Sequence, residues 1–77
     1  MMCLAIPAQI QSISVNYAYV TVMGIEKEVN IQLIEQPKVG DYVLIHAGCA
    51  IQKIDTCYFN FLQEVLTSMM EEQQGGE

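Results

Sequence analysis

Residues 39–51 read Val-Gly-Asp-Tyr-Val-Leu-Ile-His-Ala-Gly-Cys-Ala-Ile, and this stretch decides the fold. Its Gly-Asp pair follows a proline and a lysine, a combination that signals a turn. A run of β-favouring residues then leads to His46, and Gly48 interrupts the pattern as a bulge or a bend would. The stretch therefore predicts a strand that starts after a turn and ends at His46.

His46 is the only histidine in the chain. At the end of a buried strand and beside a glycine, an imidazole is either a packed core residue or a ligand. The packed role is the more common one for a histidine in such a position. The ligand interpretation therefore needs support from another part of the sequence.

The length and composition indicate one small folded domain, residues 1–77. Apolar residues make up 52% of the chain and the mean hydropathy is +0.27, unlike the composition of disordered proteins. Nine acidic residues against three lysines give a net charge of −6. Because phosphate groups are bound mainly by Lys and Arg, this balance argues against a nucleic-acid partner and against an anionic membrane surface.

The sequence predicts a cytoplasmic protein. No window reaches the ~18 consecutive apolar residues of a membrane span, and the N-terminus lacks the basic and apolar segments of a signal peptide. Three cysteines at wide spacings do not form a disulfide framework, and free thiols suit a reducing compartment. The absence of a CxxC pair argues against a closed zinc site made by this chain alone.

Five short β-rich segments alternate with turn residues. They predict strands over about residues 7–14, 17–23, 25–31, 42–46 and 50–54. A slip in the alternation at Ser12 indicates a bulge, and Gly24 marks the turn of a hairpin. Pro7 cannot donate a ladder hydrogen bond and is not expected inside a central strand. Leu33 and Ile34, in the connector, are expected to tuck under the barrel.

One helix is expected after the strands. Asp55 is the predicted N-cap of a helix over about residues 56–72, and residues 73–77 are expected to form a frayed tail. The fold class is therefore mainly β: a small OB-like barrel of about five strands, over about residues 7–54, with a C-terminal α-helix.

Cys3 is the second candidate functional residue. On its own, a cysteine near the N-terminus is most often incidental, since cysteine behaves as a small hydrophobe. Together with His46 it forms a sulfur and nitrogen pair that suits iron, copper or zinc but fills only part of any coordination sphere. The pair favours a carrier that shares its metal with a partner or with diatomic ligands. Cys49 and Cys57 are weaker candidates, for which packing is the ordinary role.

Apolar residues recur along the predicted helix at three- and four-residue steps, as in an amphipathic helix. Such a stripe is usually core, but this one is wider than one small barrel needs to cover. The remaining apolar area is a candidate docking face, to which we assign Leu62, Leu66 and Met69.

No catalytic motif is evident in the sequence, which has neither a glycine-rich phosphate loop nor an HExxH pattern. A dyad of Cys3 and His46 could act as nucleophile and base. A thin barrel without a deep cleft offers such a dyad no place to bind a substrate. We therefore do not expect an enzyme.

Three segments resemble the HypC/HybG/HupF family of hydrogenase maturation chaperones. They are Met-Cys-Leu-Ala-Ile-Pro-Ala-Gln-Ile at residues 2–10, Val-Gly-Asp-Tyr-Val-Leu-Ile-His-Ala-Gly at residues 39–48 and Ala-Ile-Gln-Lys-Ile-Asp at residues 50–55. The resemblance spans nearly the whole chain in the same order. The N-terminal Met-Cys-x-x-x-Pro block combined with GDYVxxHxG makes it specific.

The resemblance implies an OB-like barrel with a C-terminal helix that assists assembly of the iron centre of nickel–iron (NiFe) hydrogenases. It implies that the chain pairs with the iron–sulfur protein HypD, transiently holds iron as the Fe(CN)2CO unit, and delivers it to the precursor of the hydrogenase large subunit. The essential cysteine of the family corresponds to Cys3 and its histidine to His46.

The sequence departs from the family pattern at two places. The chain begins Met-Met-Cys, whereas the family cysteine follows the initiator methionine directly, so that with Met1 retained Cys3 has no free amino group. Cys49 stands where family members carry an aromatic residue, which affects how this loop meets a partner.

We therefore expect a non-enzymatic carrier in which Cys3 and His46 are the metal ligands. A flexible arm is expected to enter the partner, and the helix to supply a second contact. Two alternatives remain open: a metal-free interaction module that grips the large-subunit precursor, and a cysteine-dependent enzyme. The residues of the predicted arm are Met2, Cys3, Leu4, Ala5, Ile6 and Pro7.

Overall fold

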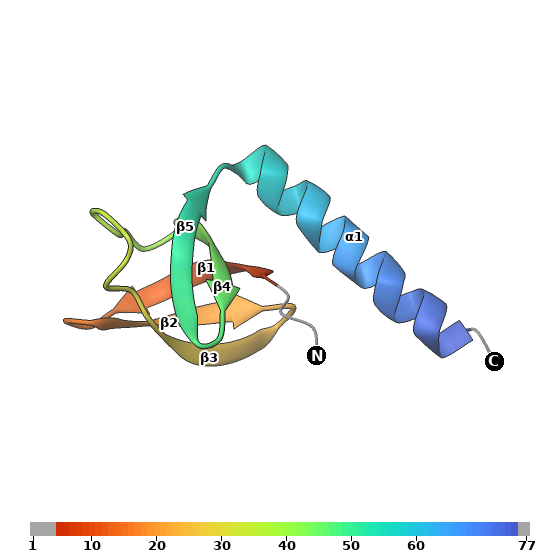
Figure 1. Cartoon of the computed structure of the whole chain (residues 1–77), viewed down its shortest axis with the longest axis horizontal. Helices are drawn as coiled ribbons and strands as arrows, with labels where there is room; N and C mark the ends of the chain where they lie inside the picture. The colour runs from red at the N-terminus through yellow and green to blue at the C-terminus, as the bar shows by residue number, and fades with distance from the viewer. Residues whose placement is uncertain (1–4, 76–77) are drawn as a thin grey trace.

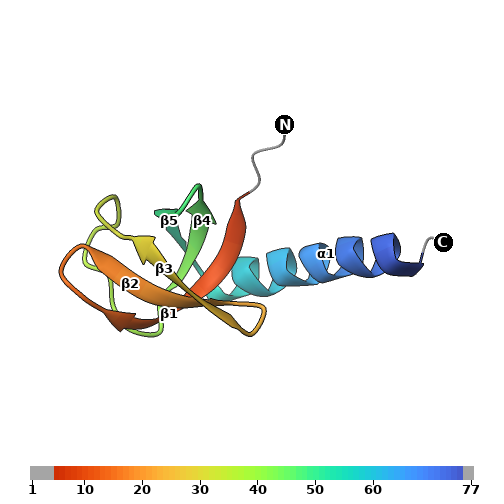
Figure 2. The ribbon, with the colours of Figure 1, turned by 90° about the horizontal axis from the view of Figure 1, so that it is seen from below.

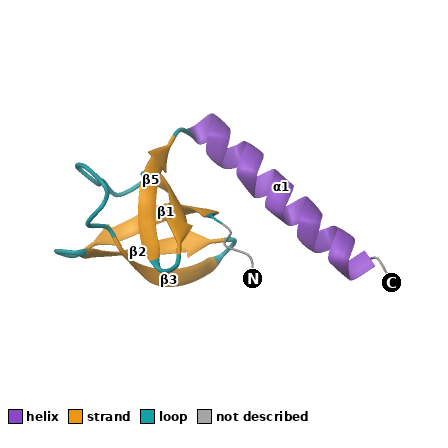
Figure 3. Cartoon of the chain, in the orientation of Figure 1, coloured by secondary structure: helices purple, strands orange, loops and turns teal. Residues whose placement is uncertain are grey.

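The computed structural model describes the backbone of residues 5–75 and the side chains of residues 5–69. Five strands are followed by one helix (Figure 1; coloured by element type in Figure 3). None of the described segments forms a helix long and apolar enough to cross a membrane. The elements are β1 (Ile6–Ile13), β2 (Tyr17–Val22), β3 (Ile25–Asn30), β4 (Tyr42–His46), β5 (Cys49–Ile54) and α1 (Thr56–Gly75).

The strands close into a barrel in the order β1-β2-β3-β5-β4. All neighbouring strands are antiparallel except β3 and β5, which run parallel and pair only through Asn30 and Cys49. The connector between β3 and β4 is tied to β5, since Lys53 Nζ donates to the Gln36 carbonyl at 2.8 Å and lies 3.3 Å from Asp41 Oδ2. The predicted mainly β fold, an OB-like barrel with a C-terminal helix, is confirmed.

The barrel interior is filled by small and branched aliphatic side chains. They alternate along the strands, as expected when one face of each strand points inward. Of the two connector residues expected to tuck under the barrel, Ile34 is buried but Leu33 is 68% exposed, so half of that prediction is wrong. The buried apolar residues are Ala8, Ile10, Ala18, Val20, Val29, Ile31, Ile34, Val43, Ile45 and Ala50.

The predicted bulge in the first strand is present. Ile10 pairs with Val20 and Ser12 pairs with Tyr19, which leaves Gln11 as the extra residue. A bulge increases the local twist of a strand. This helps β1 to bend and to pair with β2 on one edge and β4 on the other.

Pro7 is an exception to the sequence prediction, because it is the buried second residue of a strand with neighbours on both edges. It pairs with Leu44 of β4, but β2 pairs with β1 only from Gln9 onward. The edge of β1 that faces β2 therefore has no ladder hydrogen bonds at Pro7. A missing N–H is tolerated at such a position, as it is at the start of a strand.

Asp55 caps α1 as predicted. Its Oδ1 accepts a hydrogen bond from the Tyr58 amide at 2.8 Å, which satisfies one of the unpaired donors of the first turn. The helix runs to Gly75, three residues beyond the predicted end, because the two glutamines that follow the acidic pair are good helix formers.

The helix α1 begins beside the barrel, contacts β1 and β4, and extends away from the barrel toward its C-terminal end (Figures 1 and 2). Phe59 stacks on Tyr42 of β4 with 4.1 Å between the ring centroids and 29° between the ring planes. Twenty residues of α-helix span about 30 Å, and apolar side chains along α1, such as Phe61 at 59%, remain exposed. Part of the apolar stripe of α1 therefore has no counterpart on the barrel.

The closed core supplies a stability test. Ile10→Ala, at a side chain that is 1% exposed, is expected to lower the free energy of unfolding by about 2–5 kcal/mol, because it leaves a cavity. Ile25→Ala, at a strand residue that is 62% exposed, is the matched control and is expected to change it by less than about 0.5 kcal/mol. Urea unfolding measures both, and equal effects would contradict the described core.

Candidate functional site

His46 is the last residue of β4 and lies on the outer face of the barrel. Val43 and Ile45 of the same strand are buried in the core, and side chains of a strand alternate between its two faces. His46 itself is half-buried and is absent from the core cluster. The imidazole is therefore not a packed core group, and it is placed where a ligand can reach it.

The start of β1 lies beside His46. Ile6 pairs with Ile45 of β4, so the register places Ala5, the first described residue, level with His46. Met2, Cys3 and Leu4 lie outside the described residues. The predicted pairing of the Cys3 sulfur with the His46 ring therefore remains a prediction, and what the structure provides is the position of the strand that follows Cys3.

The rim of the barrel continues from His46 across the neighbouring strands. His46 pairs with Cys49 of β5, and Cys49 pairs with Asn30 of β3. The turn between His46 and Cys49 consists of two residues, Ala47 and Gly48, with φ angles of 55° and 80°. Positive φ at both central residues defines the type I′ turn that suits the twist of a two-residue hairpin.

At Cys49 the sequence predicts only a weak candidate, in the loop that follows His46. Cys49 is instead the first residue of β5 and the direct cross-strand neighbour of His46. The signal for this was present, since an Ala-Gly pair between two β-rich runs is short enough for a two-residue hairpin. Cys57 is exposed in the first turn of α1.

Among the described residues, no group of three or more His, Cys, Asp or Glu side chains gathers that could enclose a metal. The rim offers one imidazole and one thiol, a set that suits borderline-soft metals but leaves coordination positions open. Such a site shares its metal with other donors.

The predicted docking residues lie partly together. A small groove of about 80 Å³ separates the start of β1 from α1 and has an almost entirely apolar lining. Two residues of the predicted flexible arm, Ile6 and Pro7, belong to β1 instead. The groove is lined by Ala5, Pro7, Leu62, Val65, Leu66 and Met69.

The apolar stripe of α1 is divided between the barrel and the surface. Phe59, Leu62 and Leu66 are half-buried, whereas the neighbouring apolar positions are open. The exposed fractions are 45% for Tyr58, 59% for Phe61, 39% for Val65 and 45% for Met69. We call these four residues the open edge of α1.

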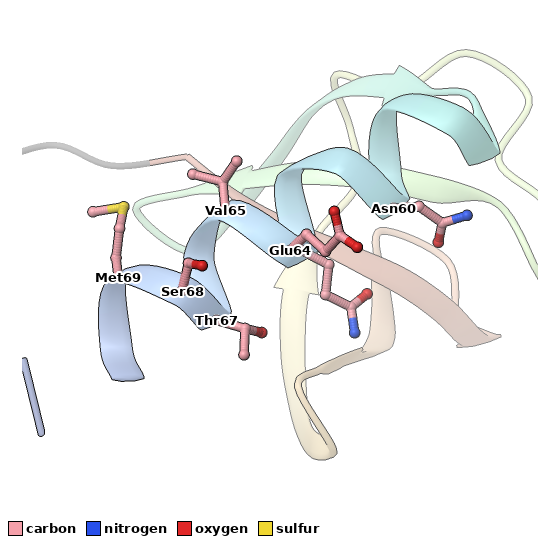
Figure 4. Close-up of a pocket in the computed structure, with 7 residues that line it drawn as sticks. Asn60, Glu64, Val65, Thr67, Ser68 and Met69 are labelled. Carbon is pink, nitrogen blue, oxygen red and sulfur yellow. The ribbon is translucent and has the colours of Figure 1, made fainter. Parts of the chain in front are cut away.

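A larger hollow of about 910 Å³ runs along α1 (Figure 4). All of its lining residues belong to the helix, and most of them are polar, among them Asn60, Glu64 and Thr67. A space bounded by one helix does not enclose a substrate. It does not have the form of a catalytic cleft, which surrounds most of its ligand.

The family model described as HupF/HypC family matches residues 2–66. The chain belongs to the HupF/HypC family. This match covers every strand of the barrel and the first half of α1, including Cys3, His46 and Cys49.

Relatives in the HupF/HypC family carry the name Hydrogenase maturation factor HypC. The one from Rhizobium leguminosarum bv. viciae is 49% identical over 55 residues, 70% of this chain and 73% of its own length. The one from Escherichia coli K12 is 34% identical over 76 residues, 91% of this chain and 84% of its own length. The one from Helicobacter hepaticus is 36% identical over 78 residues, which cover 94% of this chain and 91% of its own length.

The turn at the rim of this HupF/HypC barrel can be tested. Gly48→Ala is expected to lower the free energy of unfolding by about 1–2 kcal/mol, because φ is +80°. No heavy atom lies within 4 Å of the added Cβ, so the cost is backbone strain rather than a clash. Ala47→Gly, in the same turn with φ at 55°, is the control and is expected not to destabilise the fold. If denaturant unfolding shows no loss for Gly48→Ala, the type I′ turn is wrong.

Proposed function

We propose that this chain is a maturation chaperone of NiFe hydrogenases that, together with HypD, carries the Fe(CN)2CO unit and delivers it to the large-subunit precursor. Membership in the HupF/HypC family supports the general role. The observation that carries the proposal is the position of His46, which is half-buried on the barrel rim, level with Ala5, the residue that precedes β1.

In this proposal Cys3 and His46 are the two ligands that the chain supplies. Consecutive Cα atoms are 3.8 Å apart, so the Cα of Cys3 lies within about 7.6 Å of the Cα of Ala5. This reach is compatible with a thiolate and an imidazole on the same iron. Iron–thiolate and iron–imidazole bonds suit this donor pair, while the diatomic ligands and the partner complete the coordination.

The docking surface in this proposal is the apolar groove between the start of β1 and α1. Its lining includes Ala5, the first described residue, and five of the docking residues predicted from the sequence in all: Ala5, Pro7, Leu62, Leu66 and Met69. HypD or the precursor is proposed to bind here, so that a partner that covers the groove also contacts the residues around the metal ligand.

The proposed role requires no catalytic step by this chain, no nucleic-acid partner and no membrane. With nine acidic residues against three lysines, the surface repels phosphate backbones and anionic lipids. The cytoplasm is the proposed location, since both the thiolate ligand and the partner's iron chemistry require reduced sulfur.

Removal of Cys3 tests the ligand role. Cys3→Ala is expected to abolish iron carriage and hydrogenase maturation, because the thiolate is lost while the barrel core remains intact. Co-purification with HypD, followed by infrared spectra in the cyanide and carbonyl stretching region, measures the loss. Cys57→Ala, at an exposed cysteine on α1, is the matched control and is expected to retain the bands.

Two results separate this proposal from its alternative, a metal-free module that grips the precursor. Maturation that survives Cys3→Ala contradicts the ligand role. Wild-type complex that contains no iron beyond the partner's own cluster supports the metal-free module.

Replacement of His46 tests the second ligand. His46→Ala is expected to weaken iron retention while leaving the unfolding transition nearly unchanged, because the ring lies outside the core. Elemental analysis of the purified complex and thermal unfolding of the free chain measure the two effects. Loss of the fold would assign His46 a structural role instead.

A further inference from the structure

His46 and Cys49 place two metal-binding side chains next to each other without any contribution from Cys3. They are paired residues on the antiparallel strands β4 and β5, joined by the two-residue turn at Ala47 and Gly48. Directly paired residues have Cβ atoms about 4.5–5.5 Å apart and project from the same face of the sheet. The two side chains are therefore neighbours on the outer face of the rim.

Both side chains are available to a ligand. His46 and Cys49 are half-buried, so they are neither sealed in the core nor fully solvated. Among the described residues, no hydrogen bond engages the imidazole or the thiol. The adjacent Asn30 side chain is occupied elsewhere, because its Oδ1 accepts from the Gln32 amide at 2.8 Å.

We propose that His46 and Cys49 form a cross-strand chelate for a thiophilic divalent cation such as Zn²⁺. Co²⁺ serves as the spectroscopic analogue of Zn²⁺ in the test. Cys49 binds as the thiolate after releasing its proton to solvent, and His46 binds through a neutral ring nitrogen. Bond lengths of about 2.3 Å to sulfur and 2.0–2.1 Å to nitrogen fit between paired strand residues. Water or a partner's donor fills the remaining positions.

The short turn of the hairpin favours this chelate. A type I′ turn fixes the register of the two strands, so the two donors need little reorganisation on binding. The buried Ala50, which follows Cys49, and Ile45, which precedes His46, pair with each other and anchor the hairpin to the core. The inference shares His46 with the proposed function but needs neither Cys3 nor iron.

The test uses the full chain without an affinity tag, carrying Cys3→Ser and Cys57→Ser so that Cys49 is the only thiol. Anaerobic titration with Co²⁺ is expected to produce a thiolate-to-cobalt charge-transfer absorption that saturates at one metal per chain. Adding His46→Ala is expected to weaken binding at least about tenfold. Adding Cys49→Ser instead is expected to remove the absorption, and circular dichroism verifies that each variant is folded.

The matched control retains Cys57 as the only thiol, through Cys3→Ser and Cys49→Ser. Equal absorption from this control would overturn the proposal, because it would show that any thiol of the chain suffices. One cobalt per two chains would also overturn it, since the metal would then bridge molecules. If Cys49→Ser unfolds this control, Cys49→Ala replaces it, and equal absorption from the folded replacement, which keeps Cys57, refutes the site.

The maturation assay keeps this inference separate from the proposed function. Maturation that survives Cys3→Ala contradicts the proposed function and leaves the cobalt result unaffected. Cobalt binding that is absent from the chain with Cys49 as its only thiol contradicts the chelate and leaves the role of Cys3 unaffected.

Discussion

The two-sided pairing of β1 is the constraint on which the rest of the structure depends. This strand bonds to β2 along one edge and to β4 along the other, while β3 and β5 meet at a single pair. A chain of 77 residues has little surface to bury, and closing the sheet removes most exposed strand edges. The bulge at Gln11 supplies the additional twist that lets one strand serve both neighbours.

Closure also determines where chemistry is possible. The interior is filled with aliphatic side chains, and no polar or charged side chain is buried within the described part of the chain. Groups that bind a ligand must therefore lie on the outer face or at the rim. His46 and Cys49 face outward at the rim because the neighbouring residue of each along its strand, Ile45 or Ala50, points into the core.

The helix connects the rim to a surface that a partner can recognise. The stack of Phe59 on Tyr42 anchors its first turns to β4, the strand that ends at His46. Farther along, Leu62 and Leu66 line the groove beside the start of β1, together with Val65 and Met69 of the exposed open edge of α1. The same element thus stabilises the barrel and leaves apolar area uncovered close to the candidate ligands.

Local patterns determined the element types, the bulge, the cap at Asp55 and the family resemblance, because alternation, turn residues and capping preferences act over a few neighbouring positions. Only the tertiary structure decided that Pro7 is accommodated in β1, that Ile34 rather than Leu33 is buried, and that Cys49 lies across from His46. Those outcomes depend on which strand edge remains unpaired and on the register between strands. The unpaired edge and the register are both set by strand pairing across the barrel. The preferences of residues that are neighbours in the sequence do not specify them.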